Sequence, residues 1–243
     1  MIRNLIKALL KNIIIKSSFL NRQFTNMKNY FSTKNKLKNS SGQMKDIELK
    51  KKLRDLITNT DVNNIVEIGT WNGLGSTKML INLIKDSKKK IHFYSVEADK
   101  LCFKAAKKNL QKDIEYVNLI LGRVHEIDDL SYVNKEIIFN YGYGDKEYEW
   151  FIQDLRRYKK LKNVVTQLPK EIEILLLDGG EFSGFADFLS LHTRSNFIVL
   201  DDISSFKQHN VLGFINENNK NFELIFDSKD RRGVQIYRYL KNI

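Results

Sequence analysis

Hydrophobic and polar positions alternate along residues 46–243 in a way that predicts helices and strands in turn. Helical spacing of apolar residues marks "KDIELKKKLRDLIT" and "LCFKAAKKNLQ" as helices, and further helices are expected at about 76–86, 184–193 and 205–219. Several short runs between them are continuously apolar, as is typical of strands covered by helices on both faces. The predicted strands are "NNIVEIG", "IHFYSVE", "EYVNLILG", "EIEILLLDGG", "FIVLDD", "FELIFDS" and "GVQIYRYL".

This order of elements predicts an α/β fold, a doubly wound Rossmann-like sheet of seven mostly parallel strands. The turn "KDRRG" separates the last two strands, which indicates a C-terminal antiparallel hairpin at the sheet edge. Residues 131–168 are expected to be irregular. In such sheets a ligand lies beyond the carboxyl ends of the strands. The residues that fall there are Glu67, Gly69, Glu97, Asp178 and Asp201.

Positive charge is concentrated at the N-terminal end of the chain. Residues 1–45 hold ten Lys or Arg and no acidic residue, whereas the remainder holds 31 basic and 29 acidic side chains. The formal net charge of +12 therefore belongs mainly to this arm, and the near balance elsewhere argues against nucleic acid as a partner. We expect a basic amphipathic arm and linker over 1–45 and one domain over 46–243.

The arm leaves the cellular location open. Residues 2–15 have an apolar side and a basic side at helical spacing, and the pattern is too short and too polar to span a bilayer. A helix lying on an anionic membrane surface fits this pattern, and so does a mitochondrial transit peptide; a plain N-terminal helix is the third interpretation. The single cysteine, Cys102, excludes an internal disulfide and indicates a reducing compartment such as the cytoplasm.

A glycine-rich turn, "NIVEIGTWNGLGST", follows the first predicted strand. Its spacing is Glu67-x-Gly69-x-x-x-Gly73-x-Gly75, which differs from the G-x-G-x-x-G of a dinucleotide loop. A pyrophosphate beside Glu67 would meet a like charge, whereas an ammonium or sulfonium would be attracted. S-adenosylmethionine carries both cations and no phosphate, and glycines would let the backbone approach it closely. Simple strand-to-helix turns without a ligand are the alternative.

The ordered motifs make residues 64–240 resemble a class I S-adenosylmethionine-dependent methyltransferase, similar to small-molecule and sugar O-methyltransferases. They are "VEIGTWNGLGST", "YSVEADK", "LLLDGGEFSG" and "IVLDD". The resemblance implies a seven-stranded sheet ending in a reversed hairpin. Glu97 is expected to accept both ribose hydroxyls; alternatively it caps the next helix, although Asp99 could do so. The implied cofactor-binding residues are Glu67, Gly69, Thr70, Gly73, Ser76, Glu97, Ala98 and Asp178.

The acids after the fourth and fifth strands suggest a metal. Catechol and sugar O-methyltransferases hold Mg²⁺ at such positions, so the resemblance implies Asp178, Asp201 and Asp202 as ligands. Alternatively, Asp178 contacts the methionine amino group or the substrate, and Asp202 caps the next helix. Relatives often have a histidine where this chain has Glu181, which excludes a histidine base at that position.

The expected reaction is an in-line displacement at a sulfonium methyl, and a hydroxyl acceptor must also lose its proton. The candidate catalytic residues are Asp178, Glu181 and His209, with the Asp178/Asp202 pair and a metal as a further source of a base.

The identity of the methyl acceptor is the part of the function that the sequence determines least. Residues 139–158 contain seven aromatic residues and two glycines, which suggests a lid stacking on a glycan or small hydroxylated acceptor. The alternative is a helix packed on the sheet, with Trp150 and Phe151 in the core and Arg156 and Arg157 solvated. A nucleic-acid or protein methyltransferase and a non-catalytic binding protein are the other functions considered. The first lacks support, because no "NPPY"-like tetrapeptide follows the fourth strand and Pro169 is the only proline.

Overall fold

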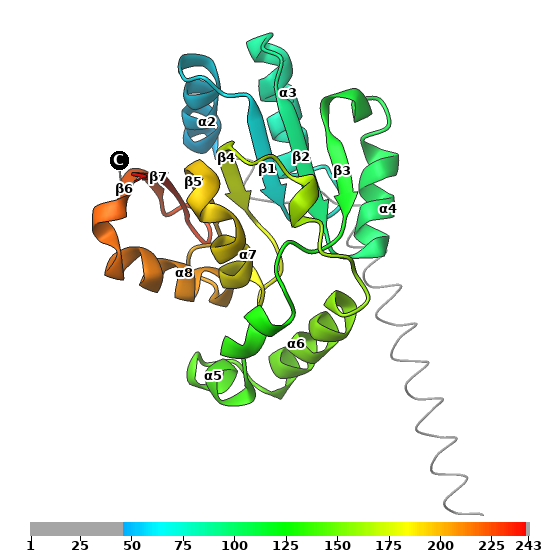
Figure 1. The fold of residues 1–243 in the computed structure, drawn as a ribbon, viewed down its shortest axis with the longest axis vertical. Helices are drawn as coiled ribbons and strands as arrows, with labels where there is room; N and C mark the ends of the chain where they lie inside the picture. Colours follow the sequence, from blue (N-terminus) through cyan, green and yellow to red (C-terminus); the bar gives the residue numbers. More distant parts are fainter. Residues whose placement is uncertain (1–45, 242–243) are drawn as a thin grey trace, which may run out of the picture. The chain divides into compact units, whose positions relative to one another are not determined.

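The computed structural model describes residues 46–241, which form a seven-stranded sheet between two layers of helices (Figure 1). The strand order is β3-β2-β1-β4-β5-β7-β6. The first five strands along the chain are parallel to one another, and β7 runs antiparallel to both β5 and β6. The strands are β1 (Asn64–Ile68), β2 (His92–Glu97), β3 (Asn118–Leu121), β4 (Ile172–Leu177), β5 (Ser195–Asp201), β6 (Phe222–Ser228) and β7 (Val234–Tyr239). The predicted fold, including the reversed hairpin, is confirmed.

Alternate side chains of the strands point to opposite faces of the sheet and pack into two hydrophobic cores, one on each face. Ile65 packs with buried residues of α2 and α3, whereas its neighbour Val66 packs with buried residues of α7 and α8. The α-helices are α2 (Ile47–Asn59), α3 (Ser76–Ser87), α4 (Lys100–Asn109), α5 (Lys135–Asn140), α6 (Asp145–Tyr158), α7 (Gly184–Leu191) and α8 (Phe206–Glu217). Short 3-10 helices are η2 (Ile114–Tyr116), η3 (Asp128–Tyr132), η4 (Val165–Gln167), η5 (His192–Arg194) and η6 (Asn219–Asn221).

The register of the central strands brings their carboxyl ends level. Ile68 pairs with Val96 of β2 and with Leu177 of β4, and Leu177 pairs in turn with Leu200 of β5. The residues that follow these positions therefore meet at one edge of the sheet, where parallel α/β proteins bind ligands.

The segment between β3 and β4 differs from the expectation of an irregular region, because it contains α5 and α6. Figure 1 shows both helices beyond the end of the sheet to which the parallel strands point. They share a small hydrophobic core that includes Ile138, Phe151, Phe182 and Phe206. Trp150 is 45% exposed, so the interpretation that placed it in a core is wrong. This α5–α6 insert covers the edge where the predicted site lies.

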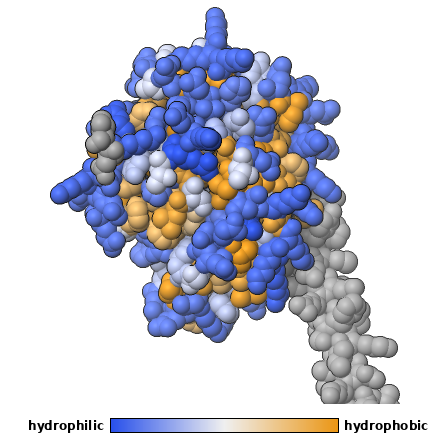
Figure 2. Space-filling model, viewed as in Figure 1, coloured by the Kyte–Doolittle hydropathy of each residue, from blue (hydrophilic) through white to orange (hydrophobic). Residues whose placement is uncertain are grey.

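Within residues 46–241, no helix is both long and apolar enough to cross a membrane. Hydrophilic residues predominate on the face of the molecule seen in Figure 2, with hydrophobic residues between them. The predicted arm over 1–45, its membrane-surface helix at residues 2–15 and its transit-peptide alternative lie outside the described residues.

Candidate functional site

The turn after β1 is clamped to its two neighbouring strands. The Gly69 amide donates to the Val96 carbonyl and the Asp178 amide donates to the Ile68 carbonyl, both at 2.9 Å. Gly69 has φ +102°, and a Cβ there would lie 2.2 Å from the Asp178 carbonyl oxygen. A Cβ at Gly73 would lie 2.7 Å from a methyl of Leu110, next to α4. Contacts within the protein therefore require both glycines, whereas the sequence suggested close approach of a ligand.

Glu67 lies beneath this turn and is completely buried. Its Oε2 accepts hydrogen bonds from Thr77 Oγ1 at 2.7 Å and from Ser95 Oγ, which also hydrogen bonds with Thr70 Oγ1. Its Oε1 has no hydrogen-bond partner among the described residues. Burial raises the pKa of Glu67 to about 7, against the opposing effect of nearby hydroxyl groups.

The position of Glu67 follows from strand alternation. Glu67 is two residues from Ile65, so its side chain points to the face covered by α3, between the sheet and Thr77. This differs from the expectation that Glu67 faces a cationic ligand directly. The predicted cofactor residues Thr70 and Ser76 are buried as well. We describe Glu67 as a positioning residue that holds the turn from below.

Glu97, at the end of β2, joins the turn to the start of α4. Its Oε2 accepts from the Trp71 amide at 2.6 Å, and its Oε1 accepts from the Asp99 amide at 2.7 Å. The cap of α4 is Asp99, whose carboxylate accepts from the amides of Leu101 and Cys102. The capping alternative for Glu97 is thereby wrong. Burial raises the pKa of Glu97 to about 7.

The insert reaches the same edge through α6. Arg157 Nε lies 3.4 Å from Asp99 Oδ2, and Arg157 Nη1 lies 3.2 Å from Asp154 Oδ1. Burial raises the pKa of Asp154 to about 6, although the Arg157 guanidinium acts in the opposite direction. The Arg157–Asp99 pair ties α6 to the segment beside Glu97 and Ala98, whereas the Arg157–Asp154 pair lies within α6. Arg157 is therefore not the freely solvated residue that one interpretation expected.

The three predicted metal-ligating acids do come together. Asp178, Asp201 and Asp202 each offer a carboxylate oxygen, and these oxygens all lie within 4.8 Å of one another. Asp201 is only 5% exposed, and its Oδ1 has no hydrogen-bond partner in the described part of the chain. Burial, followed by the charge of Asp178, raises the pKa of Asp201 to about 8. Parallel strands with level ends account for the meeting of Asp178 and Asp201.

A lysine that sequence reasoning missed lies in this acidic cluster. Lys207 Nζ is 2.6 Å from Asp178 Oδ1 and 3.3 Å from Asp202 Oδ2, and its side chain is 5% exposed. Burial by itself lowers the pKa of Lys207, but the carboxylates outweigh it and the pKa lies above the usual value. One signal was available: Lys207 falls in the first turn of α8, where the helix dipole disfavours a cation without acidic partners.

The cluster fits Mg²⁺ in one respect and conflicts with it in another. Carboxylate oxygens are the ligands that Mg²⁺ prefers. The ammonium of Lys207, however, lies among the same oxygens and already supplies positive charge there. An added dication would meet this ammonium, so the residues present do not fit a bound Mg²⁺ as they stand.

The other two predicted catalytic residues do not belong to the acidic cluster. Glu181 Oε1 accepts from the Tyr143 hydroxyl at 2.7 Å and from the Phe206 amide at 3.0 Å, which links the insert to the start of α8. His209 is exposed, and its ring packs edge-on against Tyr141 at 5.2 Å. Glu181 is therefore placed as an anchor of the insert, and His209 lies on the outer side of α8.

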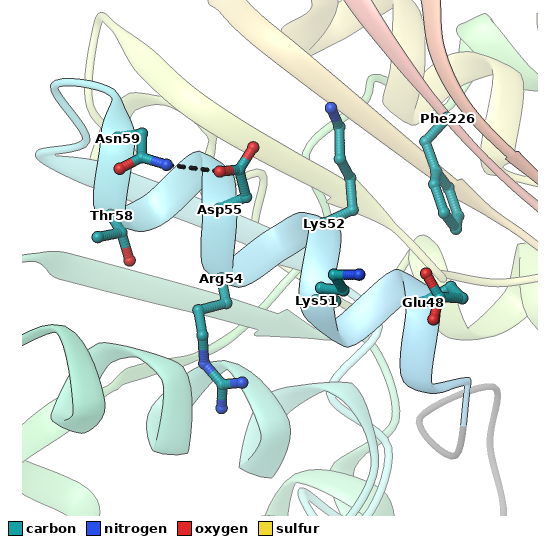
Figure 3. Close-up of a pocket in the computed structure, with 8 residues that line it drawn as sticks. All are labelled: Glu48, Lys51, Lys52, Arg54, Asp55, Thr58, Asn59 and Phe226. Atoms are coloured by element: carbon teal, nitrogen blue, oxygen red, sulfur yellow. Dashed lines mark hydrogen bonds between the residues drawn. The ribbon is translucent and has the colours of Figure 1, made fainter.

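Two surface cavities accompany these elements. One, of about 590 Å³, adjoins the loop after β5; its lining includes Tyr132, Tyr141, Phe185, Ser205 and His209. The other, of about 470 Å³, lies on α2 beside Phe226 of β6 (Figure 3). None of the predicted site residues lines the second cavity, which is surrounded by charged side chains of α2. The first cavity is thus the one that adjoins the predicted site.

No family model and no curated protein matches this sequence. Solved structures do resemble the fold. An O-methyltransferase from Bacillus cereus in complex with SAH has a TM-score of 0.52 at 12% identity, with 83% of this chain and 82% of that chain covered. Cofactor-bound Rv0187 from MTB has a TM-score of 0.53 at 12% identity, with 89% and 90% covered. A candidate O-methyltransferase from Klebsiella pneumoniae has a TM-score of 0.54 at 12% identity, with 87% and 88% covered.

The strand order, the reversed hairpin and these similarities define the class of fold. The chain has the fold of class I methyltransferases, as the resemblance in its motifs implied.

Proposed function

We propose that the protein is an S-adenosylmethionine-dependent methyltransferase that methylates a hydroxyl group of a small acceptor. The placement of Glu97 is the main support. Its carboxylate lies at the end of β2 and is bonded to the amides of Trp71 and Asp99, next to the glycine turn. Each carboxylate oxygen can accept more than one hydrogen bond, so both oxygens retain capacity for the two ribose hydroxyls.

The charge at this edge favours a cationic donor over a dinucleotide. Glu97, Asp178 and Asp99 lie around the turn, whereas the hydroxyl network beneath it orders the backbone through Glu67. A pyrophosphate would be repelled by these carboxylates, and the ammonium and sulfonium groups of S-adenosylmethionine would not. We therefore assign Gly69, Thr70, Gly73 and Ser76 to shaping the cofactor site.

In the proposed reaction an acceptor oxygen attacks the methyl carbon, and the bond between that carbon and the sulfonium sulfur breaks. The sulfur keeps the electron pair, S-adenosylhomocysteine leaves, and the hydroxyl proton passes to a carboxylate. We assign that role to Asp178, because it follows β4 directly, contacts the Gly69 turn and is half-buried at the site edge. Glu181 and His209 are assigned to holding the insert and lining the adjoining cavity.

The acceptor class is proposed from the cavity beside His209. Its aromatic and hydroxyl-bearing lining suits a ring that carries hydroxyl groups, such as a phenol or a sugar, and about 590 Å³ is within the usual range of small-ligand sites. A glycan acceptor is compatible with the same lining. Contact with a membrane surface through residues 2–15 and a cytoplasmic or mitochondrial location stay predictions from the sequence.

Isothermal titration calorimetry on the full chain tests the cofactor. We expect saturable heat with S-adenosylmethionine and S-adenosylhomocysteine, and none with NAD. Hydrogen bonds to a charged group are each worth about 1.5–3 kcal/mol, so loss of both ribose bonds in Glu97→Ala is expected to weaken binding by at least about 100-fold. Glu97→Gln retains one acceptor oxygen, so its affinity for S-adenosylmethionine is expected to lie between those of the wild type and Glu97→Ala.

Thermal unfolding of each variant controls for loss of structure, because Glu97→Ala also leaves two amides without their partner. A folded wild-type protein that binds NAD and not S-adenosylmethionine would refute the proposal. Once cofactor binding is established, S-adenosylhomocysteine release in the presence of phenols and sugars measures the acceptor preference.

A further inference from the structure

The acidic cluster of Asp178, Asp201 and Asp202 carries its own cation. Lys207 Nζ contacts Asp178 and Asp202, whose side chains are about one quarter exposed, and its own side chain is almost completely buried. Carboxylates this close together repel one another unless a proton or a cation compensates them. In other proteins a divalent ion has that role, and here an ammonium has it.

The neighbours of Lys207 fix its position. Gln208 Nε2 donates to the Leu177 carbonyl at 3.0 Å and to the Asp201 carbonyl at 3.1 Å, which ties the first turn of α8 to the ends of β4 and β5. On the other side, a Cβ at Gly184 would lie 2.1 Å from the Lys207 carbonyl oxygen, so α7 packs directly against the Lys207 backbone. The ammonium is therefore held in place and is not a mobile surface charge.

The cluster also retains the capacity to bind a metal. Asp201 Oδ1 is buried and has no hydrogen-bond partner in residues 46–241, and Asp201 contributes one carboxylate oxygen to the group of oxygens within 4.8 Å of one another. A buried acceptor without a partner is costly in a folded protein, and at this one, on a side chain of the acidic cluster, a bound cation would relieve that cost. Removal of the lysine would leave three oxygen donors, with the exposed Arg232 guanidinium, whose Nη1 lies 3.8 Å from Asp202 Oδ2, as a nearby cation.

We propose that Lys207 is a built-in cation that masks a divalent-metal site formed by Asp178, Asp201 and Asp202. The lysine supplies a fixed positive charge to the cluster, and the protein takes up no divalent ion there while Lys207 is present. This inference does not depend on the methyltransferase activity. If that activity is established, methyl transfer is expected to proceed unchanged in the presence of a chelator.

A titration with Mn²⁺ alone tests the inference on the full chain without a histidine tag. The amount of Mn²⁺ bound is measured from the electron paramagnetic resonance signal of the free ion. Mn²⁺ prefers the same oxygen ligands as Mg²⁺. The wild-type protein is expected to bind none at this cluster, and Lys207→Ala is expected to bind one Mn²⁺ per chain in competition with Mg²⁺. The double variant Lys207→Ala/Asp201→Asn is expected to lose that binding again.

Lys78→Ala is the matched control, because it removes a lysine from an acid that retains a second lysine: Asp113 pairs with both Lys78 and Lys85. It is expected to gain no Mn²⁺. If Lys207→Ala fails to fold, Lys207→Met preserves the side-chain volume, and its melting temperature is expected to rise with Mn²⁺ by several degrees.

Two results would overturn the inference. One is binding of one Mn²⁺ per chain by the wild-type protein that is absent in the Asp202→Asn variant. This result would mean that the metal displaces the ammonium of Lys207. The other is a folded Lys207 variant that gains neither Mn²⁺ binding nor Mn²⁺-dependent stability. Neither measurement uses S-adenosylmethionine, so failure here is distinguishable from failure of the proposed function.

Discussion

The burial of Glu67 predicts an unusual dependence of stability on pH. Its pKa is raised from 4.5 to about 7 because the carboxylate lies between the sheet and α3 with no exposure to water. A group whose pKa is higher in the folded state stabilises the fold while it is protonated, and that contribution is lost as the pH rises through the folded value. Glu67→Gln mimics the protonated form and is expected to remove this dependence.

The magnitude follows from the two pKa values. Each unit of difference corresponds to about 1.4 kcal/mol, so full ionisation of Glu67 opposes folding by about 3 kcal/mol. Most of this change falls between pH 4.5 and 7, and the part between pH 5 and 8.5 amounts to about 2.5 kcal/mol. Glu67→Gln is therefore expected to become more stable relative to the wild type by about that amount over this range.

Urea unfolding without cofactor at pH 5, 6, 7 and 8.5 measures the free energy of unfolding of both proteins. Glu97 and Asp201 also have raised pKa values, but both proteins contain them and their contributions cancel in the difference. Glu171→Gln, at an exposed position, is the control and is expected to follow the wild type at every pH. A difference between Glu67→Gln and wild type that stays constant with pH would show that Glu67 is not buried as described.

Two further predictions concern the turn and the insert. Gly69→Ala places a Cβ 2.2 Å from the Asp178 carbonyl oxygen at a positive φ, so it is expected to lower the free energy of unfolding by more than about 3 kcal/mol. The control is Gly142→Ala, which also has a positive φ but no atom near the added Cβ. It is expected to lower the free energy of unfolding by about 1 kcal/mol. Equal losses in urea unfolding would contradict the clash. Tyr143→Phe removes the hydroxyl that donates to Glu181 and is expected to speed amide hydrogen exchange across residues 135–158, with Tyr148→Phe as the control. Unchanged exchange would mean that this bond does not hold the insert.

Much of the site could be predicted because it depends on short-range patterns. Continuous apolar runs identified the strands, and the switch between strand and helix periods placed Gly69, Glu97, Asp178 and Asp201 at strand ends. Since parallel strands end at the same edge, the meeting of Asp178 and Asp201 followed from the order of elements alone.

The roles of particular side chains depended on contacts that are distant in sequence. The aromatic residues of 139–158 could equally have met a ligand or one another, and the structure shows several of them packed with Phe182 and Phe206. The same sequence pattern therefore allowed a lid and a packed helix, and only the docking of the insert on the loop after β4, on α7 and on α8 distinguishes its buried residues from its exposed ones.

The sequence by itself determined the α/β fold, the glycine turn and the set of acids at the sheet edge, because local periodicity and strand direction decide these. Tertiary structure alone decided that Thr77 of α3 bonds to Glu67 under the turn and that Lys207 reaches into the acidic cluster. Both outcomes depend on how α3 and α8 pack against the sheet, since a helix's rotation about its axis decides which side chain meets which strand end.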